Sequence, residues 1–197
     1  WNRFEVELKH TYSGNAFRDI RLTSKFYNKD SSYVVDGFYD GNSVFKIRFM
    51  PEKTGVWNYV TSSNVKALNN QKGSFECIPA SGSNHGIVRV SNMYSFKYAD
   101  GKQYYPVGTT AYAWNHMSEE VQQLTLQSLK SAGFNKVRML VFPKDYNLVK
   151  EEPKIYPFVS TGMRKGANGK EGKTFDWTTF NPEFFRVLEK QIDELNK

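Results

Sequence analysis

The sequence predicts a multidomain protein of the β plus α/β class, in which an antiparallel β-sandwich precedes the first βα units of an α/β barrel. Three observations lead to this fold class. From Trp1 to about Pro79, apolar and polar residues alternate with the period of a β-strand. Beyond residue 87 the pattern changes to strand, helix and strand, the order of a parallel βαβ unit. The chain has 197 residues, and a complete eight-stranded barrel needs about 250, so the predicted barrel is truncated.

Short alternating strands define the first domain, which we predict over residues 1-80. In the segment 4–9, apolar side chains alternate with charged ones, and the segment 45–49 repeats this pattern. Turn-forming residues separate the strands, at 13–15, 40–42 and 51–55. Several strands at a spacing of roughly 8–12 residues favour an antiparallel sandwich.

A small, polar segment follows, and we predict a linker at 81-86. The second domain, predicted over 87-197 and incomplete, begins with a hairpin whose turn is Asp100-Gly101 and whose returning strand covers 103–110. A helix is expected from Ser118, which can cap it, to Gly133, which can end it.

An apolar run at 134–142 is typical of a parallel strand. The segment 143–177 is rich in Lys, Gly, Pro and Tyr and lacks a helical period, so we expect a long loop that is functional or mobile. Asn181 and Pro182 then predict the start of a second helix with one apolar stripe.

Composition limits the possible partners. The 27 Lys and Arg residues outnumber the 20 Asp and Glu residues, but they are spread along the chain, so we expect no nucleic-acid partner. Apolar runs are too short to cross a membrane. Phosphate-loop and dinucleotide-binding motifs are absent, and the single cysteine, Cys77, offers no metal cluster, so we expect neither a cofactor nor a metal. We expect Cys77 to be buried as a small apolar residue.

The first candidate site residues follow the first parallel strand. Tyr112, Trp114 and His116 come directly after it, and the carboxyl ends of parallel strands form the working face of an α/β barrel. Aromatic rings offer flat apolar platforms for a sugar, and Asn, His or Thr side chains can satisfy its hydroxyl groups. The alternative is that Tyr112 and Trp114 are core residues that fill the mouth of the barrel.

The second strand supplies the other candidates. Arg138 lies within an otherwise apolar run and is expected to face the barrel interior, where a guanidinium requires a carboxylate partner. The alternatives are a structural ion pair or a register in which Arg138 faces solvent. Lys144, Asp145 and Tyr146 come directly after the strand. The basic residues at 164–173 are interpreted as a solvated lid in preference to an anion site.

Several motifs together resemble the opening of a bacterial apiosidase-like glycoside hydrolase, a clan with a (β/α)8 TIM barrel. They are Tyr105–Trp114, Lys136–Met139, Phe142–Lys144, Phe175–Trp177 and Phe180–Phe185. The preceding motifs, at 49–51 and 54–59, resemble the immunoglobulin-like sandwich often fused before such barrels. The resemblance covers nearly the whole chain.

The resemblance implies a function and a role for Arg138. An arginine at the matching position of these enzymes supports the catalytic nucleophile, and the two catalytic glutamates would then lie beyond residue 197. We therefore expect the amino-terminal portion of an enzyme that cleaves glycosidic bonds, inactive by itself, with carbohydrate as substrate and the remainder of the barrel as partner. The alternative is a non-catalytic carbohydrate-binding or adhesion module. Because the chain opens at Trp1 without Met, we expect a removed signal or a cut, and a secreted, periplasmic or cell-surface protein.

Overall fold

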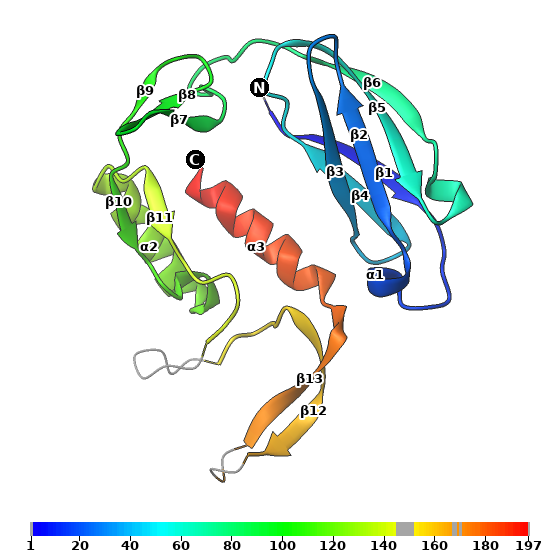
Figure 1. Cartoon of the computed structure of the whole chain (residues 1–197). Coiled ribbons are helices and arrows are strands. Elements are labelled where there is room, and N and C mark those ends of the chain that lie inside the picture. Colours follow the sequence, from blue (N-terminus) through cyan, green and yellow to red (C-terminus); the bar gives the residue numbers. More distant parts are fainter. Residues whose placement is uncertain (1, 145–151, 167–168, 170, 197) are drawn as a thin grey trace. The chain divides into compact units, whose positions relative to one another are not determined.

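The computed structural model describes residues 2–144, 152–166, 169 and 171–196 (Figure 1). The chain forms two compact units, Trp1–Tyr105 and Pro106–Lys197. The predicted linker at 81–86 falls inside the first unit, and its role as a domain boundary stays a prediction.

The first unit consists almost entirely of β-strands. A six-stranded sheet has the order β1-β4-β3-β2-β5-β6, with antiparallel neighbours throughout, and a three-stranded sheet has the order β7-β8-β9. Its elements are β1 (Phe4–Lys9), α1 (Ala16–Asp19), β2 (Leu22–Tyr27), β3 (Ser32–Tyr39), β4 (Val44–Phe49), β5 (Gly55–Ser63), η1 (Lys66–Leu68), β6 (Lys72–Cys77), β7 (Val88–Asn92), β8 (Ser95–Tyr98) and β9 (Gln103–Tyr104).

The large sheet curls because one strand is shared between two partners (Figure 1). The first part of β3, up to Asp36, pairs with β2, and the rest, from Gly37, pairs with β4. A Cβ atom at Gly37 would lie 2.8 Å from a side-chain atom of Leu22 and 2.9 Å from one of Ile47, so only glycine allows this close packing. The curl brings the edge strands β1 and β6 together, where the rings of Phe4 and Phe75 stack at 3.8 Å.

The core of the first unit lies inside this curl. Large side chains with no exposed surface fill it, among them Phe26, Ile47 and Trp57. Phe26 stacks on Phe49 with ring centroids 4.4 Å apart. The predicted alternation in 4–9 and 45–49 is confirmed, and Cys77 is buried as expected.

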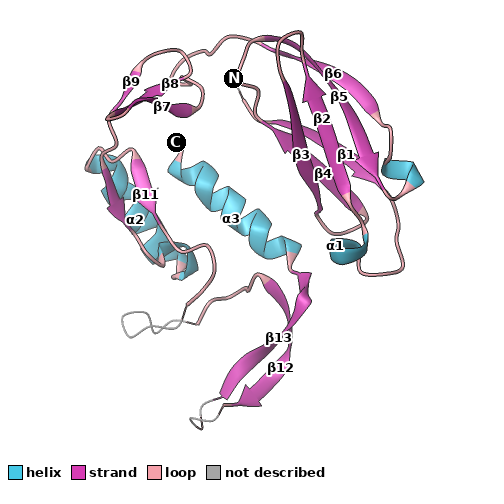
Figure 2. Cartoon of the chain, viewed as in Figure 1, coloured by secondary structure: helices cyan, strands magenta, loops and turns pink. Residues whose placement is uncertain are grey.

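In its described residues, the second unit has short parallel strands, the helices α2 and α3, and a hairpin (Figure 2). β10 and β11 pair in parallel, and β12 and β13 pair antiparallel. The elements are β10 (Gly108–Thr110), η2 (Trp114–His116), α2 (Glu119–Ser131), β11 (Lys136–Arg138), β12 (Phe158–Lys165), β13 (Glu171–Phe180) and α3 (Pro182–Leu195).

The predicted fold class, an immunoglobulin-like sandwich followed by the first βα units of a (β/α)8 TIM barrel, is wrong. The first six strands form one curled sheet, where the prediction requires two packed sheets. In the described part of the second unit, one three-residue parallel pair is followed by an antiparallel hairpin, where the prediction requires a series of βα units. The described chain as a whole is richer in strand than in helix. The prediction failed because the alternating pattern specified strands but not their partners.

Boundaries within the second unit also differ from the prediction. The segment 143–177, expected as a long loop, contains β12 and most of β13, and the strand expected at 134–142 shortens to β11. The helix starts are confirmed. Ser118 Oγ accepts the backbone N–H of Val121 in α2, and Asn181 Oδ1 accepts that of Glu183 in α3.

Candidate functional site

The candidate site lies where β10 and β11 end side by side. Their parallel register sets Thr110 opposite Arg138. The two segments stay joined beyond the strands, because Ala111 N–H donates to the Arg138 carbonyl at 3.0 Å and Leu140 N–H donates to the Tyr112 carbonyl at 2.7 Å. The carboxyl ends of adjacent parallel strands are where ligands commonly bind in α/β folds.

A buried amide network fixes the backbone at this position. Asn115 is 6% exposed, and its Nδ2 donates to the Leu140 carbonyl at 3.0 Å. Gln191 of α3, 8% exposed, donates through Nε2 to the Asn115 carbonyl at 2.8 Å and to Gln122 Oε1 at 3.1 Å. The network therefore links η2 to both α2 and α3. Asn115 Oδ1 is buried with no hydrogen-bond partner among the described residues, a state that costs free energy unless a water or ligand donates to it.

His116 lies beside this network. Its ring stacks on Phe184 of α3, with centroids 6.2 Å apart, and its Nε2 faces Asn115 Nδ2 at 3.3 Å. Because an amide nitrogen is only a donor, this contact requires an unprotonated Nε2. Burial lowers the pKa of His116 below its ordinary value, and hydrogen bonds to the backbone of Leu140 and Val141 oppose the shift weakly. The contact with Asn115 and the burial both favour the neutral form of the imidazole.

Trp114 and Tyr112 have different roles. Trp114 is buried and donates through Nε1 to Met139 Sδ at 3.2 Å. It therefore belongs to the core, which was the alternative to a sugar-binding role. Tyr112 is partly exposed, and the guanidinium of Arg138 lies 5.6 Å from its ring centroid. Tyr112 therefore offers its ring at the surface, together with a cation.

Arg138 is the last residue of β11, and its expected place in a closed interior stays a prediction. Its side chain is exposed, because β11 pairs only with β10 among the described strands, and no second neighbour encloses it. Lys144 is also exposed. Asp145 and Tyr146 lie outside the described residues. The described surface of the site thus carries the guanidinium of Arg138 near the Tyr112 ring, and the chain exposes a second cation, Lys144, six residues after Arg138.

Sequence reasoning missed Gln191 and Phe184 as parts of this site. Phe184 was expected in the apolar stripe of the second helix, but its contact with His116 depends on the tertiary fold. Gln191 follows Phe184 by seven residues and Leu188 by three, so it is a polar residue on the apolar face of α3. A polar residue on an apolar helix face is the sequence feature from which a role for Gln191 could have been predicted.

The described residues contain no group of three or more His, Cys, Asp or Glu side chains arranged to hold a metal ion. None of the helices in the described ranges is long and apolar enough to cross a membrane.

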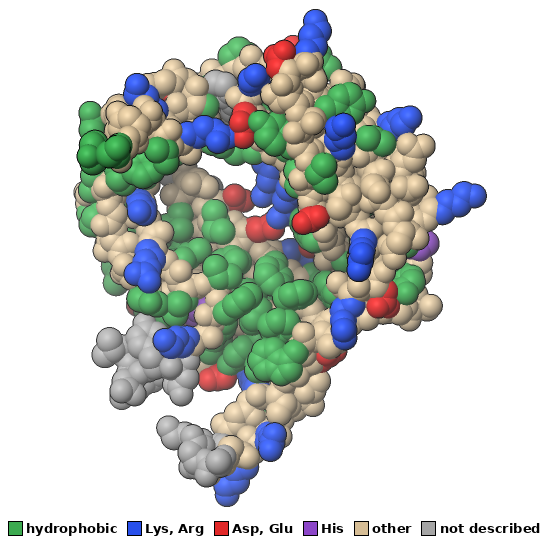
Figure 3. Space-filling view, viewed as in Figure 1, with side chains coloured by type: hydrophobic (Ala, Val, Ile, Leu, Met, Phe, Trp, Pro, Cys, Tyr) green, Lys and Arg blue, Asp and Glu red, His purple; other side chains and the backbone are tan. Residues whose placement is uncertain are grey.

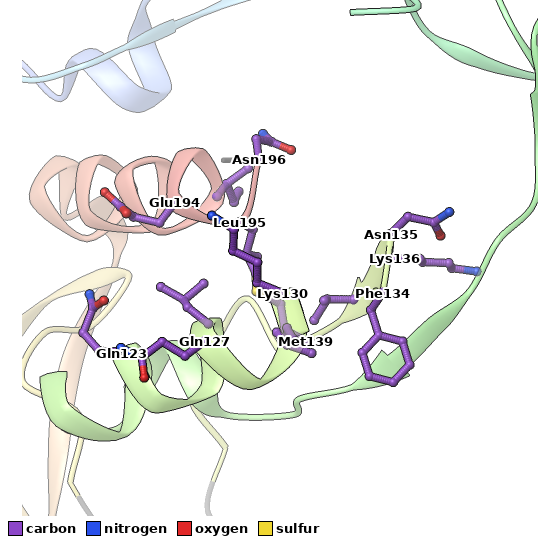
Figure 4. A pocket seen from close by; sticks show the side chains of 14 residues that line it. Gln123, Gln127, Lys130, Phe134, Asn135, Lys136, Met139, Glu194, Leu195 and Asn196 are labelled. Atoms are coloured by element: carbon purple, nitrogen blue, oxygen red, sulfur yellow. The ribbon is translucent and has the colours of Figure 1, made fainter. Parts of the chain in front are cut away.

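A separate pocket lies between α2, β11 and α3 (Figure 4). It is open, with a volume of about 680 Å³, and its lining includes Gln127 of α2, Lys136 of β11 and Leu195 of α3. Val137 and Met139 also line it, so the pocket extends along β11. The described lining includes none of the predicted site residues.

Comparison with known proteins gives a match to a family model over part of the chain and a similar solved structure. Residues 1–64 match the domain of unknown function DUF5060. No curated protein matches the chain. Among solved structures, the chain resembles a protein from Bacteroides vulgatus ATCC 8482 that carries the provisional name of glycoside hydrolase, with 53% identity and a TM-score of 0.93.

The similarity extends over 100% of this chain but over only 38% of the Bacteroides protein. It covers both compact units, and therefore the strand-end site. The chain is thus similar over its whole length to part of a protein named as a glycoside hydrolase.

Proposed function

We propose that the chain is part of a glycoside hydrolase and that the ends of β10 and β11 form part of its glycan-binding surface. The observation that carries this proposal is the 53% identity with the Bacteroides protein over the full length of the chain. At this level of identity the two proteins share their backbone, as the TM-score of 0.93 indicates.

The chemistry of the site supports binding. Tyr112 offers a partly exposed ring, which suits the C–H face of a sugar, and the exposed Lys144 can donate to hydroxyl groups, while the contribution predicted for His116 stays a prediction. Trp114, as a buried residue, would support this surface from beneath. The predicted contributions of Asp145 and Tyr146 stay predictions.

The described contacts of the site contain no carboxylate, and cleavage of a glycosidic bond normally requires two. We therefore assign the acid/base and nucleophile carboxylates to the part of the enzyme that corresponds to the unmatched portion of the Bacteroides protein. The guanidinium of Arg138, exposed at the end of β11 and held near Tyr112, would support such a carboxylate electrostatically. Within glycoside hydrolases, the sequence motifs favour the apiosidase-like group, acting outside the cytoplasm.

The test compares the 197-residue chain with the polypeptide expressed from the full reading frame. Both are assayed for reducing-sugar release from soluble plant and host polysaccharides. We expect release by the full polypeptide only, and a loss of at least about 100-fold in Arg138→Ala, the scale typical of removing a charge-stabilising group. Binding without release by the full polypeptide would favour the non-catalytic module instead. Release that Arg138→Ala leaves unchanged would contradict the role of Arg138.

A further inference from the structure

The β12–β13 hairpin presents an exposed tryptophan. Trp177 of β13 is 70% exposed, although tryptophan is usually largely buried. Figure 3 shows apolar side chains gathered over α3 and the base of the hairpin, with basic side chains toward its far end. A large exposed ring next to an apolar surface indicates a binding position.

The backbone around Trp177 departs from regular pairing. Along β12 the register passes from Phe158 opposite Phe180 to Val159 opposite Asp176, so β13 contributes the extra residues 177–179 at this point. Such a bulge changes the direction of side chains and is frequent next to functional sites. The Asp176 carboxylate accepts the backbone N–H of Thr178 at 2.9 Å and its hydroxyl at 2.6 Å, which holds the bulge in shape.

Neighbouring rings hold Trp177 while its outer surface stays open. Phe158 meets it edge to face, with centroids 5.1 Å apart, and Phe175 lies 5.4 Å away in a tilted arrangement. A ring fixed in this way loses little conformational entropy when a ligand stacks on it. The Trp177 ring is therefore preorganised to stack on a flat apolar ligand.

A continuous series of rings connects Trp177 to the strand-end site. Phe158 lies 6.4 Å from Phe142, Phe142 lies 6.3 Å from Phe184, and Phe184 lies 6.2 Å from His116, all between centroids. The hairpin ring and the candidate site are thus joined by one series of aromatic contacts, which passes through the buried Phe184. A ligand longer than one sugar could contact both.

From the bulge, the exposure and this continuity, we infer that Trp177 is a substrate-binding residue that stacks on a sugar unit of a polysaccharide whose chain also reaches the strand-end site. The inference rests on the proposed function, and it adds a residue and a preference for polymeric substrates. The C–H face of a pyranose or furanose ring matches the open face of the indole in size and polarity.

The experiment is affinity gel electrophoresis of the 197-residue chain in gels containing arabinogalactan, xyloglucan, galactomannan or polygalacturonate. We expect retardation by at least one polysaccharide. Trp177→Ala should bind about tenfold more weakly, the scale of one aromatic contact, and Trp177→Phe should recover most of the affinity. The matched control is Tyr94→Ala in the first unit, which removes a ring that is 90% exposed and is not part of this series of aromatic contacts.

The possible failures are distinct. If the chain binds a polysaccharide and Trp177→Ala binds equally well, the inference on Trp177 is overturned while the proposed function stands. If Tyr94→Ala loses as much affinity as Trp177→Ala, the binding is not specific to this surface and the inference also fails. If the unsubstituted chain binds none of the four polymers, the proposed glycan-binding role and the inference fail together. A thermal melt of each variant verifies folding, and Trp177→Thr, which suits a strand, replaces Trp177→Ala if that variant is unfolded.

Discussion

Substitution of Gln191 by leucine tests whether α3 holds the strand-end site in place. Gln191 is 8% exposed and donates two hydrogen bonds, at 2.8 Å to the Asn115 carbonyl and at 3.1 Å to Gln122 Oε1. Leucine has a similar volume and a similar helix propensity, so the change removes the donors and little else.

The cost can be worked out from the two acceptors. Asn115 is buried, so its carbonyl loses a partner that water cannot easily replace, at about 1–3 kcal/mol. Gln122 is only half-buried, and its Oε1 can return to water at little cost. The additional apolar surface of leucine offsets part of the loss. We expect Gln191→Leu to lower the free energy of unfolding by about 1–2 kcal/mol.

Urea unfolding followed by tryptophan fluorescence measures this change, and Gln123→Leu is the matched control. Gln123 lies on α2 with an exposed side chain, so its substitution should change the free energy of unfolding by less than about 0.5 kcal/mol. If Gln191→Leu is as stable as the unsubstituted chain, or if Gln123→Leu costs as much, the network does not hold the site as described.

Three further predictions concern the core, the imidazole and a helix cap. Phe26→Ala, in the centre of the curled sheet, should destabilise the first unit by about 3–5 kcal/mol in urea unfolding, and a loss below about 1 kcal/mol would contradict the described packing. Because burial lowers the pKa of His116, the unfolded chain binds the proton more readily, so the free energy of unfolding should fall as the pH decreases below about 6.5. When the free energy of unfolding is measured from pH 8 to pH 5, it should fall less in His116→Gln than in the unsubstituted chain. Parallel pH profiles for these two proteins would refute the prediction. Asn181→Ala removes the acceptor for the backbone N–H of Glu183 and should cost about 0.5–2 kcal/mol, whereas unchanged thermal stability would show that the cap contributes nothing.

Local features of the fold could be predicted because their causes lie within a few residues. The strands at 4–9 and 45–49 follow from alternation, which depends only on the two faces of a single strand. The starts of α2 and α3 follow from Ser118 and Asn181, each of which bonds to a backbone N–H two or three residues later. The hairpin turn at Asp100-Gly101 is confirmed for the same reason, because Gly101 adopts the positive φ that the turn requires.

The parallel pairing of β10 and β11 was predictable, but the side-chain contacts around their ends were not. Residues that follow β10 and β11 were identified from strand order alone, and the parallel register brings them together. The sequence did not indicate that Trp114 would be buried against Met139 or that Gln191 would reach the Asn115 carbonyl. Each of these contacts joins residues at least 25 positions apart, and no local pattern records which distant side chains will meet.

The sequence by itself determined where α2 and α3 begin, which faces of the strands at 4–9 and 45–49 are apolar, and that Cys77 is buried. Only the tertiary structure decided how the strands pair. A sandwich of two sheets and a single curled sheet require the same alternation, and the choice between them depends on how β3 is shared at Gly37. The exposure of Arg138 has the same origin. Burial of a side chain depends on which neighbours enclose its strand, and those neighbours are set by long-range packing that a pattern of period two does not encode.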